Sequence, residues 1–260
     1  MKGRTAIVTG SASGIGKATA LCLAREGANV VIADINEDDA KGVGDLARQH
    51  GVQALVQRVD VSDAEQIRSL VEETVRQFGT VDILVNNAAD LGLLENDLDV
   101  VETSFEVLDK TYASNFRGAF AACKYALPHM LTSGRGAIVN VSSIQSTLGD
   151  YDKAAYSMMK AAINSLTQCI ATRFGREGIR CNAVSPGPVM NREAGKEWPE
   201  AMRVGYLEHV TTPDIGAPAE LGEVITFLAS DRASYINGAV IPVDGGYSAH
   251  MHLDTREIYA

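Results

Sequence analysis

Two side chains in this sequence have the types and the spacing for proton chemistry. Tyr156 and Lys160 lie four residues apart at the start of an Ala-rich stretch with a helical pattern. In a helix, this spacing places both side chains on one face, with their Cβ atoms roughly 5–6 Å apart. A free phenol titrates near pH ~10, but a fixed ammonium beside it favours the phenolate and lowers its pKa. The pair therefore predicts a tyrosine that exchanges a proton with a bound substrate at neutral pH.

A serine is predicted to lie near this tyrosine. Residues 136–142 form a strand-like run, and Ser143 follows directly. The strand can aim the Ser143 hydroxyl at the cleft into which Tyr156 points. Simple turn chemistry is the alternative for both Ser142 and Ser143.

An asparagine lies inside a long helical stretch at residues 103–130, which we expect to break before Pro128. This residue, Asn115, is flanked by Phe116 and Phe120. A mid-helix Asn is usually solvated, but an Asn on an aromatic-flanked face needs a hydrogen-bond partner.

A glycine-rich turn lies near the N-terminus. Gly10, Gly14 and Gly16 stand between a strand-like run at residues 5–8 and a helical pattern at residues 17–26. Glycine lets the backbone approach a ligand closely, and a helix N-terminus offers N–H groups to a pyrophosphate. The spacing is G-x-x-x-G-x-G rather than G-x-G-x-x-G. Such turns also occur for steric reasons, but the strand before and the helix after favour a nucleotide site.

An acid at the end of the second predicted strand indicates which nucleotide binds. Asp34 ends the run at residues 29–34, about 18 residues after Gly16. An acid there accepts hydrogen bonds from the adenosine ribose and repels a 2′-phosphate. The alternative is that Asp34 only begins the next turn. We favour the ribose role and predict NAD rather than NADP as the cofactor.

Strand-like and helical runs alternate along the rest of the chain. The further predicted strands are residues 54–61, 81–85, 180–184 and 239–243, and the further predicted helices are residues 37–50, 63–78, 152–176 and 220–230. This alternation predicts an α/β fold, a doubly wound, Rossmann-like parallel sheet of about seven strands with helices on both faces. We expect residues 1–260 to form a single domain. Ligands bind beyond the carboxyl ends of such strands, where Gly10, Asp34, Asp60 and Asn86 are predicted to lie.

Composition narrows the classes of function. The formal net charge of -10 disfavours general binding to nucleic acid or to an anionic membrane. No run of about 18 apolar residues occurs, and no apolar leader precedes the first strand-like run, so neither a transmembrane helix nor a signal peptide is predicted. The four cysteines form no C-x-x-C, and the histidines have no zinc-type spacing. We therefore expect reduced thiols, no metal and a cytoplasmic location.

A substrate lid is predicted near residues 190–213. Within this segment Trp198, Met202 and Tyr206 recur every fourth residue, as one apolar helical stripe. Such a stripe is more often core than functional, but its place after a predicted cofactor loop favours a lid. The expected substrate contacts are Gln145, Tyr151, Trp198 and Met202. They suggest a bulky, largely apolar substrate, such as a cyclic or steroid-like alcohol.

In combination these features resemble the short-chain dehydrogenase/reductase family, over nearly the whole chain. The matching pieces are Thr-Gly-x-x-x-Gly-Ile-Gly at residues 9–16, Asp60-Val61, Asn-Asn-Ala at residues 86–88, Asn115, Ser143, Tyr-x-x-x-Lys at residues 156–160 and Pro186-Gly187. The resemblance implies an NAD-dependent oxidoreductase that interconverts a secondary alcohol and a ketone by hydride transfer. It also implies a homotetramer whose long helices pair between subunits. Ala89 and Asn191 depart from the family pattern, which often has Gly and Thr there.

The resemblance implies a role for each catalytic residue. Tyr156 is the general acid/base, and Ser143 donates a hydrogen bond to the same substrate oxygen. Lys160 lowers the tyrosine pKa and holds the nicotinamide ribose, and Asn115 keeps a water that links the lysine to solvent. The implied cofactor contacts are Gly10, Ser13, Gly14, Ile15, Gly16, Asp34, Asp60, Val61, Asn86, Ala88, Tyr156, Lys160, Pro186, Gly187, Val189 and Asn191.

Two other functions are compatible with this fold. A non-catalytic, NAD-sensing regulator would bind the nucleotide but has no need of the four catalytic side chains. An enoyl reductase of the same superfamily is disfavoured. Resemblance to that group would imply a longer spacing between the Tyr and the Lys than the three intervening residues in this sequence.

Overall fold

A parallel sheet forms the centre of the molecule in the computed structural model, which describes residues 1–191 and 198–250. Within these residues the sheet has seven strands, in the order β3-β2-β1-β4-β5-β6-β7, and every neighbouring pair is parallel. The strands are β1 Thr5–Thr9, β2 Asn29–Asp34, β3 Ala54–Arg58, β4 Ile83–Asn86, β5 Gly136–Val141, β6 Ile179–Pro186 and β7 Val240–Val243. The predicted doubly wound α/β fold is confirmed.

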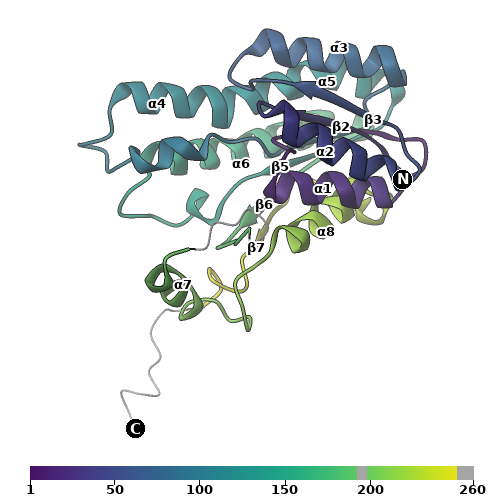
Figure 1. Ribbon diagram of the computed structural model, residues 1–260. Coiled ribbons are helices and arrows are strands. Elements are labelled where there is room, and N and C mark those ends of the chain that lie inside the picture. Colours follow the sequence, from purple (N-terminus) through teal and green to yellow (C-terminus); the bar gives the residue numbers. More distant parts are fainter. Residues whose placement is uncertain (192–197, 251–260) are drawn as a thin grey trace.

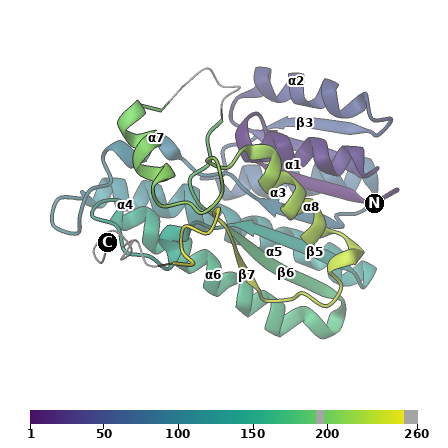
Figure 2. The same ribbon diagram turned by 90° about the horizontal axis from the view of Figure 1, so that it is seen from below.

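Helices cover both faces of this sheet (Figures 1 and 2). They are α1 Gly14–Arg25, α2 Glu37–Arg48, α3 Ala64–Phe78, α4 Phe105–Tyr112, α5 Gly118–Ser133, α6 Ala154–Phe174, α7 Glu200–Leu207 and α8 Pro218–Ala229. Side chains of β1 alternate between two apolar cores: Ala6 and Val8 pack with residues of α1, α2 and α8, whereas Ile7 packs with residues of α3, α5 and α6. Burial on both faces explains why the strands are almost continuously apolar.

The order of the strands reverses between β1 and β4. From β1 the chain moves outward through β2 to β3, then crosses back to β4 and continues to β7. Connections that leave in opposite directions open a crevice at the carboxyl ends of these two strands. Gly10 follows β1 and Ser143 lies just beyond β5, so this edge of the sheet gathers the predicted chemistry.

The helical stretch around Asn115 differs from its expectation. A π-helical turn, Ala113–Arg117, joins α4 to α5 and contains Asn115. Helix α5 then runs through Pro128 to Ser133, so the predicted break before the proline is wrong. Leu127 and Met130 on either side of Pro128 are buried in the core, and this packing offsets the missing N–H of the proline.

Helix α7 lies beyond the carboxyl edge of the sheet, away from both cores (Figure 1). It contains no fully buried residue, so the apolar stripe predicted for this segment is not part of the core. Residues 192–197 of the predicted lid lie outside the described residues. The lid itself therefore stays a prediction.

Candidate active site

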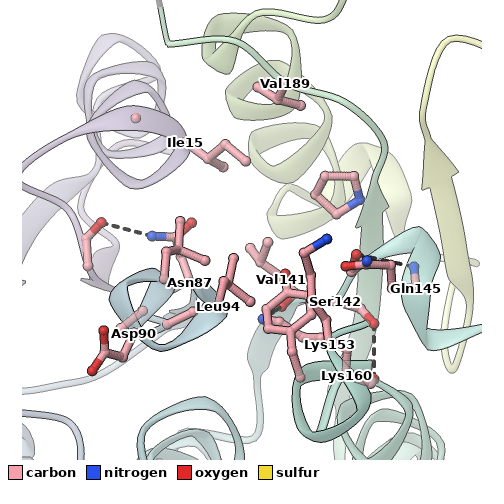
Figure 3. A pocket seen from close by; sticks show the side chains of 18 of the residues that line it. Ile15, Asn87, Asp90, Leu94, Val141, Ser142, Gln145, Lys153, Lys160 and Val189 are labelled. Carbon is pink, nitrogen blue, oxygen red and sulfur yellow. Dashed lines mark hydrogen bonds between the residues drawn. The ribbon is translucent and has the colours of Figure 1, made fainter. Parts of the chain in front are cut away.

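A cavity of about 1350 Å³ opens at the carboxyl edge of the sheet. In Figure 3, Ile15 and Asn87 lie across this cavity from Lys160, with Val189 at its upper side. The predicted site residues that line the cavity are Gly10, Ser13, Gly14, Ile15, Asp34, Asp60, Val61, Ala88, Ser143, Gln145, Tyr151, Tyr156, Lys160, Pro186, Gly187, Val189, Asn191 and Trp198. The fold thus brings together residues that lie far apart in the sequence.

The glycine loop after β1 is held by Asn87, which follows β4. The Asn87 Nδ2 donates to the carbonyls of Thr9 at 3.0 Å and Gly10 at 2.8 Å. A Cβ on Gly16 would lie 2.0 Å from the Gly10 carbonyl oxygen, so that only glycine fits there. Gly16 therefore packs α1 against the loop and is not among the residues that line the cavity.

The N-terminus of α1 opens into the cavity and fits a pyrophosphate. Ser13 at the N-cap makes no side-chain capping hydrogen bond, which leaves the first N–H groups of the helix for a ligand. Among the described residues, a Cβ on Gly14 would meet only Asn191 Nδ2, at 3.8 Å. The backbone is therefore open to a dinucleotide at this point.

Asp34 lines the cavity at the end of β2. Its two carboxylate oxygens accept from the backbone N–H groups of Ala12 and Asn36, each at 2.9 Å. These bonds fix the orientation of the carboxylate. Each oxygen can still accept a second hydrogen bond, so ribose hydroxyls are suitable partners.

Ser143 and Tyr156 both line the cavity, with their side chains close enough to interact. Burial raises the pKa of Tyr156, and the hydrogen bond with the Ser143 hydroxyl opposes this effect in part. The Ser143 Oγ also accepts from the backbone N–H of Gln145 at 3.2 Å, which orients the serine. Two neighbouring hydroxyls can bind the same substrate oxygen.

Lys160 is almost fully buried, and its Nζ lies 5.5 Å from the centroid of the Tyr156 ring. The Nζ donates to the Val141 carbonyl at 2.8 Å. Burial lowers the pKa of Lys160 to about 8, so the group is mostly protonated at neutral pH. The expectation of an acidified phenol is corrected here: the ammonium is directed at the Val141 carbonyl, and desolvation leaves the pKa of Tyr156 raised.

Asn86 is the last residue of β4, and its side chain points into the core. Its Nδ2 donates to Asn140 Oδ1 at 2.8 Å and lies 3.3 Å from Cys123 Sγ. Asn86 is not among the residues that line the cavity, and its predicted cofactor contact stays a prediction. The neighbouring Asn87 is the residue whose side chain holds the glycine loop. In the sequence, the repeated Asn is the only hint of this role.

Asn115 is buried beside the cavity rather than in its lining. The Asn115 Oδ1 accepts from the Asp90 N–H and from the Ser114 hydroxyl, each at 2.9 Å. Its Nδ2 is buried and finds no hydrogen-bond partner among the described residues. Such a buried donor is suited to a small polar partner such as water.

Met202 does not line the cavity in the described part of the chain, and its predicted substrate contact stays a prediction. Trp198 and Tyr206 do line it, with ring centroids 5.2 Å apart. Met202 is instead 48% exposed. Met202 and Tyr206 both belong to α7, but only Tyr206 and the preceding Trp198 line the cavity.

A polar cluster at the rim was not predicted. The Gln145 side chain donates to the Asp150 carboxylate, and Lys153 Nζ lies 3.5 Å from Asp150 Oδ2. All three residues line the cavity, and Tyr151 between them is 97% exposed. The charged run just before α6 is the signal for this cluster in the sequence.

No group of three or more His, Cys, Asp or Glu side chains in residues 1–191 and 198–250 is arranged to hold a metal ion. None of the helices found in those ranges has the length and apolar character needed to cross a bilayer.

Known proteins resemble this chain over nearly its whole length. The family described as Enoyl-(Acyl carrier protein) reductase matches residues 10–248. A Bradyrhizobium diazoefficiens protein named "Probable short-chain type dehydrogenase/reductase" is 41% identical over 250 residues, 96% of this chain and 89% of that protein. Cis-4-hydroxycyclohexanecarboxylate dehydrogenase of Sinomonas cyclohexanicum is 39% identical over 249 residues, 95% of this chain and 97% of that protein. The structure of levodione reductase matches with a TM-score of 0.88 at 30% identity, covering 96% of this chain and 100% of that one.

Substitution Lys160→Met should raise the melting temperature at pH 7. Folding lowers the pKa of Lys160 from 10.5 to about 8, which corresponds to about 3 kcal/mol of destabilisation while the group is charged. Between these two pKa values the unfolded state binds more protons than the folded state, so the wild type gains stability as pH rises through this window. The advantage of the variant, measured by thermal unfolding, should therefore shrink from pH 7 to pH 10.

The matched control is Lys110→Met, because Lys110 is an exposed lysine paired with Glu106. It should show no such gain at pH 7. A lower melting temperature for Lys160→Met, or a gain that does not change with pH, would contradict the analysis.

Proposed function

The chain belongs to the short-chain dehydrogenase/reductase family, and from that premise we propose that it is an NAD-dependent oxidoreductase that interconverts a secondary alcohol and a ketone. The observation that carries the proposal is that the Ser143 and Tyr156 side chains lie close enough to interact in the cavity, with Lys160 one helical turn away. One substrate oxygen can bind both hydroxyls, as this chemistry requires.

Tyr156 acts as the general acid/base, taking the proton from an alcohol or giving it to a ketone. The Ser143 hydroxyl donates to the same oxygen and stabilises its developing negative charge. The Lys160 ammonium, one helical turn from Tyr156, is assigned to the nicotinamide ribose of the bound cofactor. The buried Nδ2 of Asn115 supports its role as the holder of a water that relays protons to the lysine.

The cofactor is assigned to the other half of the cavity. The N-terminus of α1 at Gly14 and Ile15 holds the pyrophosphate, Asp34 holds the adenosine ribose, and Asp60 and Val61 border the adenine. Bound NAD would supply the hydride acceptor. The loop after β6, with Gly187 and Val189, faces the nicotinamide.

The substrate is assigned to the mouth of the cavity. Leu91, Leu94, Leu148 and Trp198 give this region apolar walls, and the Gln145–Asp150–Lys153 cluster adds polar groups at its rim. Such a surface favours a bulky, largely apolar ring alcohol with one or two polar substituents. The name of the Sinomonas relative, a dehydrogenase of a hydroxylated cyclohexane ring, agrees with that class.

Enoyl reduction is the second candidate, because the matching family carries that description. The Tyr-x-x-x-Lys spacing favours carbonyl chemistry instead. A non-catalytic NAD sensor is the third, and it needs none of the four catalytic side chains. Assays with an enoyl thioester and with a panel of ketones, each followed by NADH absorbance, separate the three.

Substitution Tyr156→Phe tests the proposed chemistry directly. Removing the proton donor should lower turnover of the best alcohol in a panel of secondary, cyclic and steroid alcohols by about 100- to 10,000-fold. NADH affinity, measured by fluorescence titration, should change less than about threefold, because the phenyl ring keeps the packing. Tyr235→Phe is the control, since Tyr235 is fully exposed outside the cavity. Turnover that survives Tyr156→Phe would refute the assigned role.

Asp34 sets the expected cofactor preference. The wild type should have a higher kcat/KM with NADH than with NADPH, and Asp34→Asn should lower the NADH value by about 10- to 100-fold, the range for one charged hydrogen bond. The same substitution should raise the NADPH value, because it removes the charge that repels a 2′-phosphate. Asp38→Asn on the exposed face of α2 is the control. A wild-type preference for NADPH would mean that Asp34 has another role.

A homotetramer is proposed from the aromatic surface of α4 and α5. Phe105 is 83% exposed and Phe120 is 49% exposed, and Tyr112, Phe116 and Phe120 stack in series along this surface. Light scattering after size exclusion should give four times the 27.7 kDa chain mass. Phe120→Glu should lower that mass, because a charge in a paired interface is costly, whereas Tyr235→Glu should not. A monomeric wild type would exclude the assembly.

A further inference from the structure

The first turn of α6, the helix that carries Tyr156 and Lys160, is capped by a segment far away in the sequence. The Lys153 N–H donates to the Asp97 carbonyl at 2.8 Å, and the Ala154 N–H donates to the Leu98 carbonyl at 3.1 Å. The Ala155 N–H donates to Asp97 Oδ1 at 3.0 Å, and the Tyr156 N–H donates to Asp97 Oδ2 at 2.7 Å. Two adjacent residues thus bind four successive backbone donors.

The chain next to α6 does not provide this cap itself. Lys153 occupies the N-cap position with φ +63° and makes no side-chain capping bond. An ordinary N-cap is extended and offers a side-chain oxygen to the N–H groups of the first turn. The left-handed backbone at Lys153 is disfavoured for a residue with a side chain, so contacts elsewhere must stabilise it. The Asp97 segment makes those contacts.

Asp97 is unusual for a carboxylate because it is only 1% exposed. Both of its oxygens bind the first turn of α6, and Oδ1 also lies 3.4 Å from the Thr103 hydroxyl. A buried carboxylate is retained only where donors replace its water. Its donors here include the N–H of the tyrosine to which we assign the proton transfer.

The same helical turn is also held at its other end. The Ser142 hydroxyl donates to the Lys160 carbonyl at 3.1 Å (Figure 3). The backbone from Tyr156 to Lys160 is therefore fixed at Asp97 on one side and at the end of β5 on the other. Small displacements of reacting groups lower rates steeply, so this fixation bears on catalysis.

We propose that Asp97 is a positioning residue for the reaction, which holds the phenol of Tyr156 in register with the Ser143 hydroxyl by binding the backbone of the catalytic turn. The inference rests on the proposed function. The segment that precedes Asp97 carries Leu91 and Leu94, which line the cavity. Asp97 therefore connects the cavity wall at Leu91 and Leu94 to the backbone of Tyr156.

The variant Asp97→Asn tests this role with little change of shape. An amide has one oxygen in place of two, so one of the N–H groups of Ala155 and Tyr156 loses its acceptor. Asp99→Asn is the matched control: Asp99 is exposed and its Oδ1 caps only its own loop, at Val101 and Glu102. For the wild type and both variants, kcat per site is the maximal rate divided by the concentration of nucleotide-binding sites, which an NADH titration gives. This normalisation removes the effect of any unfolded fraction.

We expect Asp97→Asn to lower kcat per site by about 10- to 100-fold, while KM for the alcohol and the affinity for NADH change less than about twofold. The deuterium isotope effect on kcat with a carbinol-deuterated alcohol should increase or stay at its full value, because the chemical step is slowed. Asp99→Asn should match the wild type. A kcat per site within twofold of the wild type in Asp97→Asn, or an equal loss in Asp99→Asn, would overturn the proposal.

Amide hydrogen exchange separates this inference from the proposed function. Faster exchange of the peptide that contains Ala155 and Tyr156 in Asp97→Asn, but not in Asp99→Asn, supports the capping geometry. Unchanged exchange overturns it. If the wild type transfers no hydride with any alcohol or ketone, the proposed function fails, and the exchange result still decides whether Asp97 holds the turn.

Discussion

The ammonium of Lys160 is buried inside the protein, and the candidate site must supply polar partners in place of the water that this group loses. An ammonium has three donors and is strongly hydrated in water, so it is retained in the interior only where protein oxygens replace water. The Val141 carbonyl at the end of β5 is one such oxygen. Burial lowers the pKa of Lys160 to about 8, so the charged form of this lysine is still less stable in the folded protein than in water. Such a penalty is typical of functional sites, where a reactive arrangement is kept at the expense of stability.

The parallel sheet explains how this lysine comes to lie beside the other site residues. In a parallel sheet the strands all end at the same edge, and the loops that follow them meet there. Gly10, Asp34 and Ser143 each stand at or just after the end of a strand. Two apolar cores hold the strands from both faces. The positions of the reactive groups are thus inherited from the packing of residues that take no part in the chemistry.

Local pattern is sufficient to predict some of these positions, but not others. A buried apolar run ends at Asp34, so its place at the sheet edge follows from periodicity. Asn86 and Asn87 are adjacent, and neighbouring residues of a strand point in opposite directions. The Asn86 side chain therefore points into the core, whereas the Asn87 side chain reaches the glycine loop. No local feature of the sequence tells which of the two asparagines does which. The raised pKa of Tyr156 depends on how completely the fold excludes water from it, which the sequence does not encode locally.

The two halves of the cavity differ in how they are built, and this difference bears on specificity. The half assigned to the nucleotide is made of strand ends and the first turn of α1, which hydrogen bonds between side chains and backbone groups and close glycine packing hold in place. The half assigned to the substrate is made of the polar rim around Asp150 and the rings of Trp198 and Tyr206, which stand outside the two cores. Residues in connecting segments can change without disturbing a core. Relatives that share the fold but carry different substrate names, such as the cyclohexane-ring dehydrogenase and levodione reductase, are consistent with that division. In the proposed function, substrate choice is thus set in the rim and the ring pair, and the proton chemistry is set at the sheet edge.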